Sequence, residues 1–215
     1  MNLNTRNYPP TSGIRVPAAE MKTLLARLFA AVDMSSSDAE ILANILTIND
    51  RRCLFSHGMG QVPYYLQKIK DGLVNPRPDI AVVREAPGAL VMDGDGGLGY
   101  FPCYEGTKRI IAKAKQGGVA VLTTHNHQHV GSAGNYTRMA IAEDCIGIAA
   151  SSYADHLDPD SLIYSVVDAS PMSIAFPAGG QPPLVMDMGG VVINFYEELF
   201  NRLPTTFFKA MALTS

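Results

Sequence analysis

Hydrophobic residues recur at helical spacing near the start of the chain. The first apolar stripe has members one to four positions apart: Met21, Leu24, Leu25, Leu28, Phe29 and Val32. This spacing predicts an amphipathic helix. A second helix is predicted to begin at Ser37, because Glu40 stands three residues further on in a capping-box pattern. The buried face of this helix is expected to hold Ile41, Leu42, Ile45 and Leu46.

After these two helices the predicted elements become shorter, and the spacing of the hydrophobic residues changes. Residues 61–72 predict a helix closed by Gly72, and residues 75–78 (NPRP) predict a turn or linker. From Asp79 onward, β-rich runs alternate with helical ones. Strands are expected at 79–83, 89–93, 119–124, 145–152, 172–178 and 182–188, the run 119–124 being buried. Helices are expected at 133–144 and around the face formed by Tyr104, Thr107, Ile111 and Ala114.

These elements predict three parts of the chain. Residues 1–76 form a helical N-terminal segment that belongs to a substrate domain, and residues 77–190 form an α/β cofactor-binding region. Residues 191–215 are predicted to be a truncated helical tail. The tail carries an apolar stripe that needs a partner surface, on the N-terminal helices or on another subunit: Leu199, Phe200, Leu203, Phe207, Phe208 and Met211.

Composition excludes several classes of function. With 215 residues, of which 47% are hydrophobic and 17% charged, the chain can bury a sizeable core. The net charge of -3 and the lack of basic runs argue against nucleic acid as a partner. Four prolines interrupt the longest uncharged run, residues 169–186, so no membrane span is expected. Three dispersed cysteines and no signal peptide predict a cytoplasmic protein.

The segment GDGGLG has the spacing of a dinucleotide fingerprint. Gly94, Gly96 and Gly99 follow a predicted strand and precede a predicted helix. The next strand, however, ends in Thr124 and His125, where the fingerprint requires an acidic residue. A glycine-rich structural turn and a phosphate-binding turn both remain open.

Three of the five histidines stand at alternate positions after the run 119–124. His125, His127 and His129 would point to one face of a strand and could chelate zinc if a further ligand were present. They could instead form a polar loop, or a proton-transfer site beyond the carboxyl end of a strand, with a histidine near its ordinary pKa. A fourth, His57, lies beside Ser56 in a loop between helices.

Three segments resemble a known family in order and spacing. Residues 50–78, which include SHG, residues 96–136, which include HVGSAGNY, and residues 173–190 are similar to the malate/L-lactate dehydrogenase family of NAD(P)-dependent 2-oxoacid reductases. The resemblance implies an α/β fold of this type that is not a Rossmann fold, with a helical N-terminal segment. It also implies an active site between two domains, near the subunit interface of a homodimer.

The resemblance further implies roles for individual residues. His129 would be the acid/base that acts on the substrate oxygen, and His57 would line the pocket for nicotinamide and substrate. Asp187, Met188 and Gly189 would contact the cofactor, NAD or NADP. The reaction would be hydride transfer to or from a 2-oxo or 2-hydroxy acid such as malate or lactate, without a metal, with His125 and His127 as bystanders.

One alternative to an active enzyme stays open. Family members are longer than this chain, and they commonly carry an arginine four residues after the SHG histidine, where this sequence has Gln61. An amide cannot make the charged bidentate pair that an arginine makes with a substrate carboxylate. The alternative is a non-catalytic, truncated paralogue or fragment that keeps the fold and the dimer surface.

Overall fold

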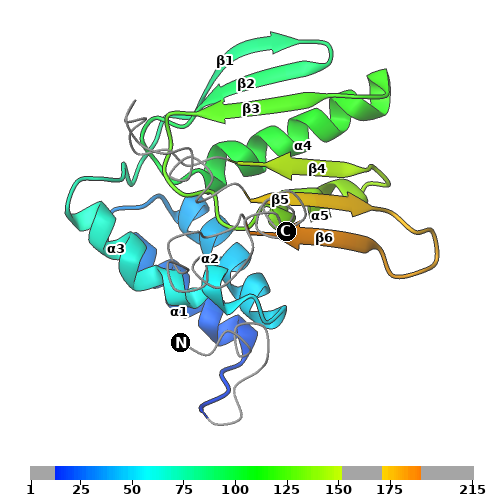
Figure 1. Ribbon diagram of the computed structural model, residues 1–215. Coiled ribbons are helices and arrows are strands. Elements are labelled where there is room, and N and C mark those ends of the chain that lie inside the picture. The colour runs from blue at the N-terminus through cyan, green and yellow to red at the C-terminus, as the bar shows by residue number, and fades with distance from the viewer. Residues whose placement is uncertain (1–12, 152–170, 190–215) are drawn as a thin grey trace, which may run out of the picture. The chain divides into compact units, whose positions relative to one another are not determined.

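The computed structural model describes residues 13–151 and 171–189 (Figure 1). The chain divides into two compact units, Met1–Gly131 and Ser132–Ser215. Each unit has its own three-stranded sheet.

Three helices open the first unit: α1 (Ala18–Ala30), α2 (Ser36–Arg51) and α3 (Val62–Lys70), with 3-10 turns at Phe55–His57 and Met59–Gln61. Gly72 closes α3 as predicted, in a left-handed conformation with φ of 71°. The core that these helices share includes Leu25, Phe29, Leu42, Leu46 and Tyr65. Leu24 and Leu28 of the predicted stripe are instead partly exposed, at 48% and 37%, because the stripe is wider than the strip of α1 that the core covers.

The N-cap of the second helix lies two residues before the predicted Ser37, and the helix begins at Ser36. Ser35 is its N-cap residue, and the Ser35 hydroxyl accepts a hydrogen bond from the backbone N–H of Asp38 (3.1 Å) and donates one to the Asp38 carboxylate (2.7 Å). Asp38 thus stands three residues after the cap, as Glu40 does after Ser37, but its carboxylate binds the cap hydroxyl and not the backbone N–H that a capping box uses. An aspartate in the first turn also favours the helix dipole. Three of the four residues expected on the buried face of α2 are buried, namely Leu42, Ile45 and Leu46, whereas Ile41 is half-buried.

A three-stranded mixed sheet completes the first unit. Strand β1 (Ala81–Ala86) runs antiparallel to β2 (Ala89–Asp93), and β2 runs parallel to β3 (Val121–His125). Helix α4 (Tyr100–Gly117) connects the two parallel strands and lies along one face of the sheet (Figure 1). A Cβ on Gly106 would lie 2.6 Å from Leu122, so this glycine lets α4 approach the sheet closely.

The prediction of a buried strand at 119–124 was wrong. Strand β3 alternates between exposed and half-buried positions, and Val121 is 58% exposed. The reason is that β3 lies at the edge of this sheet and α4 covers one face, so only alternate side chains meet a partner among the described residues.

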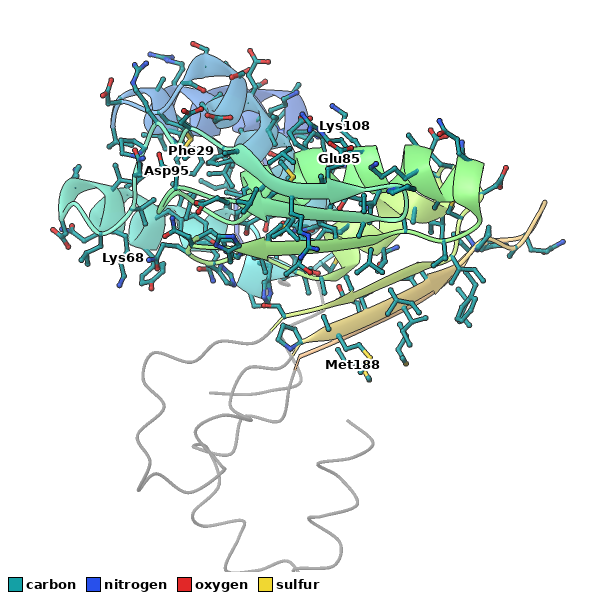
Figure 2. All side chains as sticks on the ribbon, turned by 90° about the horizontal axis from the view of Figure 1, so that it is seen from above. Phe29, Lys68, Glu85, Asp95, Lys108 and Met188 are labelled. Atoms are coloured by element: carbon teal, nitrogen blue, oxygen red, sulfur yellow. The ribbon has the colours of Figure 1, made fainter. Side chains whose placement is uncertain are left out.

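The second unit packs helix α5 (Gly134–Ile141) against an antiparallel sheet of β4 (Gly147–Ala150), β5 (Met172–Phe176) and β6 (Leu184–Met188). Thr137 of α5 and Ser173 of β5 are joined by a hydrogen bond of 2.8 Å between their hydroxyls. The opposite face of the sheet is apolar; its exposed side chains are Ile148, Met172, Phe176, Leu184 and Met186. Figure 2 shows Met188 at the end of β6.

The predicted tail, residues 191–215, lies outside the described residues. The boundaries at 76 and 190 stay predictions. In the part of the chain that is described, no helix is long and apolar enough to cross a membrane.

Candidate active site

His129 lies in the loop that follows β3, as the sequence placed it. The chain turns at Asn126 (φ 51°) and again at Gly131 (φ 74°). A Cβ on Gly131 would overlap the ring of Tyr100. Glycine at this position therefore satisfies the backbone conformation and allows the loop to lie against Tyr100.

Two buried tyrosines hold the imidazole of His129. The hydroxyl of Tyr65 lies 2.6 Å from Nδ1 of His129 and 3.1 Å from the hydroxyl of Tyr100. Both tyrosine side chains are completely buried. Helix α3 supplies Tyr65 and helix α4 supplies Tyr100, so two separate helices hold one ring. Nδ1 is occupied, which leaves Nε2 as the nitrogen that a substrate could meet.

His57 lies next to this group. Its ring centroid is 5.7 Å from that of His129. The fully buried Asn49 of α2 donates a hydrogen bond to the backbone carbonyl of His57 (2.9 Å), and the hydroxyl of Ser56 lies 2.9 Å from Nδ1 of His57. The end of α2 thus positions the SHG loop, and the structure brings together the two histidines that the sequence singled out.

Burial changes the acid–base properties of this group. The pKa of His129 is lowered to about 4, mainly because the buried ring loses hydration. Repulsion from the positive charge of His57 is the second, smaller cause. The expectation of a histidine near its ordinary pKa was therefore wrong, since only the fold shows the burial. Burial, with the neighbouring Tyr100 second, raises the pKa of Tyr65, so its hydroxyl keeps its proton. At neutral pH, the group is a neutral imidazole beside a neutral phenol.

The segment GDGGLG forms a structural turn. Its backbone N–H groups donate to carbonyls of the loop that carries the histidines: Gly94 to His125 (3.0 Å), Gly96 to Asn126 (2.9 Å) and Gly99 to His129 (3.1 Å). The N–H of Gly97 donates to the carbonyl of Gly94 (2.9 Å). A phosphate would need these same donors, so the geometry favours the glycine-rich turn over the phosphate-binding one. Figure 2 labels Asp95 at this turn.

The alternating histidines do not converge. His125 is exposed, with Nδ1 3.7 Å from the carboxylate of Asp93. Both nitrogens of His127 are engaged, Nε2 with the hydroxyl of Thr124 (2.8 Å) and Nδ1 with the carbonyl of Gln128 (2.8 Å). Among the described residues, no three histidine, cysteine or acidic side chains form a group that could hold a metal ion.

The predicted cofactor-contacting residues belong to the second unit. The carboxylate of Asp187 accepts hydrogen bonds from the hydroxyl of Ser132 (2.5 Å) and the backbone N–H of Gly134 (3.1 Å), the first residue of α5. Asp187 therefore stabilises the start of that helix. Met188 is half-buried, and a Cβ on Gly189 would meet nothing within 4 Å. Their contact with a cofactor stays a prediction.

Sequence reasoning missed Tyr65, Tyr100 and Asn49 as parts of this site. A tyrosine that is buried needs a partner for its hydroxyl, and Tyr65 stands eight residues after His57 on a predicted helix. Nothing in the sequence pattern alone shows that Tyr100 contacts the ring of His129, or that Asn49 binds the backbone carbonyl of His57.

Comparisons with known proteins place these observations in a family. The family model described as malate/L-lactate dehydrogenase matches residues 16–195. The malate dehydrogenase of Pyrococcus abyssi is 30% identical over 188 residues, which are 87% of this chain and 52% of that protein. The L-sulfolactate dehydrogenase of Methanocaldococcus jannaschii is 34% identical over 167 residues, 78% of this chain and 48% of that protein.

The comparison with solved structures also finds a malate dehydrogenase. The malate dehydrogenase from Pyrococcus horikoshii matches with a TM-score of 0.75 at 33% identity, covering 84% of this chain and 52% of that one. The chain spans about half the length of the relatives that it matches. Among residues 13–151 and 171–189, one strand pair is parallel and the second sheet is antiparallel, which differs from the parallel sheet of a Rossmann fold. With an α/β fold, a helical N-terminal segment and a family match over residues 16–195, the chain belongs to the malate/L-lactate dehydrogenase family.

Proposed function

We propose that this chain serves as an oxidoreductase that transfers a hydride between NAD or NADP and a 2-hydroxy or 2-oxo acid such as malate or lactate. The observation that carries the proposal is the imidazole of His129, fixed at Nδ1 by the buried Tyr65 (2.6 Å). A histidine held in this way can exchange a proton at Nε2 with a substrate oxygen. The relatives named malate and sulfolactate dehydrogenase support this class of substrate.

Proton transfer at His129 can proceed in either direction. In oxidation, the neutral ring takes the hydroxyl proton of the substrate at Nε2, while Tyr65 accepts the hydrogen bond from Nδ1–H. In reduction, the doubly protonated ring gives its Nε2 proton to the developing alkoxide. A substrate carboxylate nearby would raise the pKa of His129 and favour that charged form. When bound, the nicotinamide supplies or accepts the hydride.

The described residues differ in how well they fit the cofactor. His57, half-buried and 5.7 Å from His129 between ring centroids, would line the pocket for the nicotinamide and the substrate. Gly189, with open space around it, suits a close approach of the backbone to the cofactor beside Met188. The carboxylate of Asp187 is already engaged at the start of α5, so Asp187 would act mainly by holding this turn.

A second candidate function is that of a non-catalytic paralogue that keeps the fold. Gln61 supports it, because the amide group of this side chain donates to the carbonyl of Ser56 (2.6 Å). The Gln61 side chain is therefore hydrogen-bonded to the SHG loop. At this position the family commonly has an arginine that binds the substrate carboxylate.

The proposal includes a homodimer in a reducing, cytosolic compartment. The apolar outer face of the β4–β6 sheet is suited to contact between protein surfaces. The three cysteines, Cys53, Cys103 and Cys145, are free thiols. Free thiols are typical of proteins that work in the reducing cytosol.

The test combines cofactor binding with turnover. NADH and NADPH are titrated by fluorescence, and their oxidation is then followed with a panel of 2-oxo acids. Active protein should lose about 10²–10⁴-fold in rate in the His129→Ala variant, the range expected for a general acid. The His125→Asn variant, which changes an exposed ring, is the matched control. Binding without turnover would favour the non-catalytic paralogue, and failure to bind either nucleotide would contradict hydride transfer by this chain.

A further inference from the structure

The ring of His127 has a defined tautomer, which its two hydrogen bonds determine. The carbonyl oxygen of Gln128 can only accept, so Nδ1 of His127, 2.8 Å away, must carry the proton. In the neutral ring Nε2 is then an acceptor, and the hydroxyl of Thr124 at 2.8 Å must donate to it. The thiol of Cys103 lies 3.4 Å from the same hydroxyl and can donate to it in turn.

The carbonyl that His127 binds belongs to the peptide unit that enters His129. The peptide unit that leaves His129 is also held, because its carbonyl accepts from the N–H of Gly99 (3.1 Å). The Cα of His129 therefore sits between two peptide planes that are both fixed by hydrogen bonds. With Nδ1 held by Tyr65, the direction of Nε2 is determined by three contacts, one of which is made by His127.

The glycine-rich turn makes room for this clamp. A Cβ on Gly99 would lie 2.6 Å from Nδ1 of His127 and 2.7 Å from the carbonyl of Gln128. A Cβ on Gly94 would lie 2.6 Å from the Cβ of His127. Real Cβ atoms do not approach other atoms so closely, so the spacing of these two glycines accommodates the imidazole of His127.

We propose that His127 is a positioning residue for the acid–base group: its Nδ1–H fixes the peptide carbonyl of Gln128 and so sets the direction in which His129 presents Nε2. This inference rests on the proposed hydride transfer for its catalytic meaning. Its geometric content does not depend on that reaction. Misplacement of an acid–base group by about 1 Å can cost about 10²-fold in rate.

Two variants of His127 test the roles of its two ring nitrogens separately. In His127→Asn, the side-chain amide nitrogen stands close to the position of Nδ1 and keeps a donor for Gln128. In His127→Gln, the amide reaches the position of Nε2 and the donor near Gln128 is lost. We expect His127→Gln to lower kcat for a 2-oxo acid by about 10–10²-fold with little change in KM, and His127→Asn to restore most of the rate. His125→Asn is the control for a neighbouring exposed histidine.

A second measurement does not need turnover. The pKa of the His129 ring, about 4 in the folded protein, is followed by NMR titration in each variant. Loosening of the loop in His127→Gln should admit water and move this pKa toward its ordinary value, whereas His127→Asn should leave it low. Equal behaviour of the Asn and Gln variants in this titration would overturn the inference. Wild-type protein without turnover would count against the proposed function alone, since the titration would still decide the role of His127.

Discussion

At the scale of single residues, the burial of His129 links proton binding to stability. The folded protein holds the pKa of His129 at about 4, whereas an unfolded histidine titrates near 6.5. Below about pH 6.5, the unfolded chain binds a proton that the folded chain does not, so stability is lost as the pH falls toward 4. The loss that this one ring can cause is roughly 3 kcal/mol by pH 4.

We therefore expect the free energy of unfolding to fall less steeply between pH 7 and pH 4.5 in His129→Gln than in the wild type. Urea denaturation at several pH values measures both slopes. Comparing the two proteins removes the contribution of Asp50, whose pKa burial raises. Identical slopes would show that His129 is not held neutral by the fold.

The hydroxyl of Tyr65 gives a second prediction at this scale. Tyr65→Phe leaves Nδ1 of His129 without its hydrogen-bond partner and removes one partner of the Tyr100 hydroxyl. Unsatisfied buried groups cost about 1–3 kcal/mol, so the urea midpoint should fall accordingly. The Tyr100→Phe variant is the matched control, because it leaves the contact between Tyr65 and His129 in place. Any dehydrogenase activity should fall more in the Tyr65 variant; the reverse order would contradict the arrangement described above.

At the scale of elements, the start of α2 can be tested directly. Ser35 caps the helix, and Ser37 lies within it. Replacing an N-cap serine by alanine costs about 1 kcal/mol on average, so Ser35→Ala should lower the free energy of unfolding by that amount. Ser37→Ala should change it by a few tenths, because alanine is a good helix former. Thermal denaturation of the two variants distinguishes the observed cap from the one that the capping-box pattern predicts.

At the scale of the whole molecule, the apolar face of the second sheet leads us to expect self-association. Ile148 and Leu184 are 72% and 65% exposed, and they lie on one face with Met172, Phe176 and Met186. Light scattering should give a mass above the 23.1 kDa of one chain. The double variant Ile148→Thr with Leu184→Thr should lower this mass, and Val119→Thr, which changes a residue of equal exposure in the first unit, should not. A wild-type protein that stays monomeric would contradict the expectation.

The hydrophobic pattern determined the element order, because helices and strands bury side chains at different periods. It placed α3 and the described strands to within a few residues, it predicted a helix where α4 lies, and it placed His129 after β3. It set the N-cap of α2 two residues late, at Ser37 instead of Ser35, and it wrongly predicted β3 to be buried. The local pattern does not show which of two serines is the N-cap of a helix, or which strand lies at the edge of a sheet.

The properties of the site were decided by tertiary structure. Family resemblance brought His57 and His129 into one hypothesis, but the pKa of His129 depends on burial and on a neighbouring charge that are not local in sequence. Tyr65 and Tyr100, 35 residues apart, meet only through packing of α3 and α4. The sequence by itself determined which groups are available and in what order. Only the fold decided that the glycine-rich turn receives an imidazole instead of a phosphate, because its N–H groups are already bonded to the loop that carries His129.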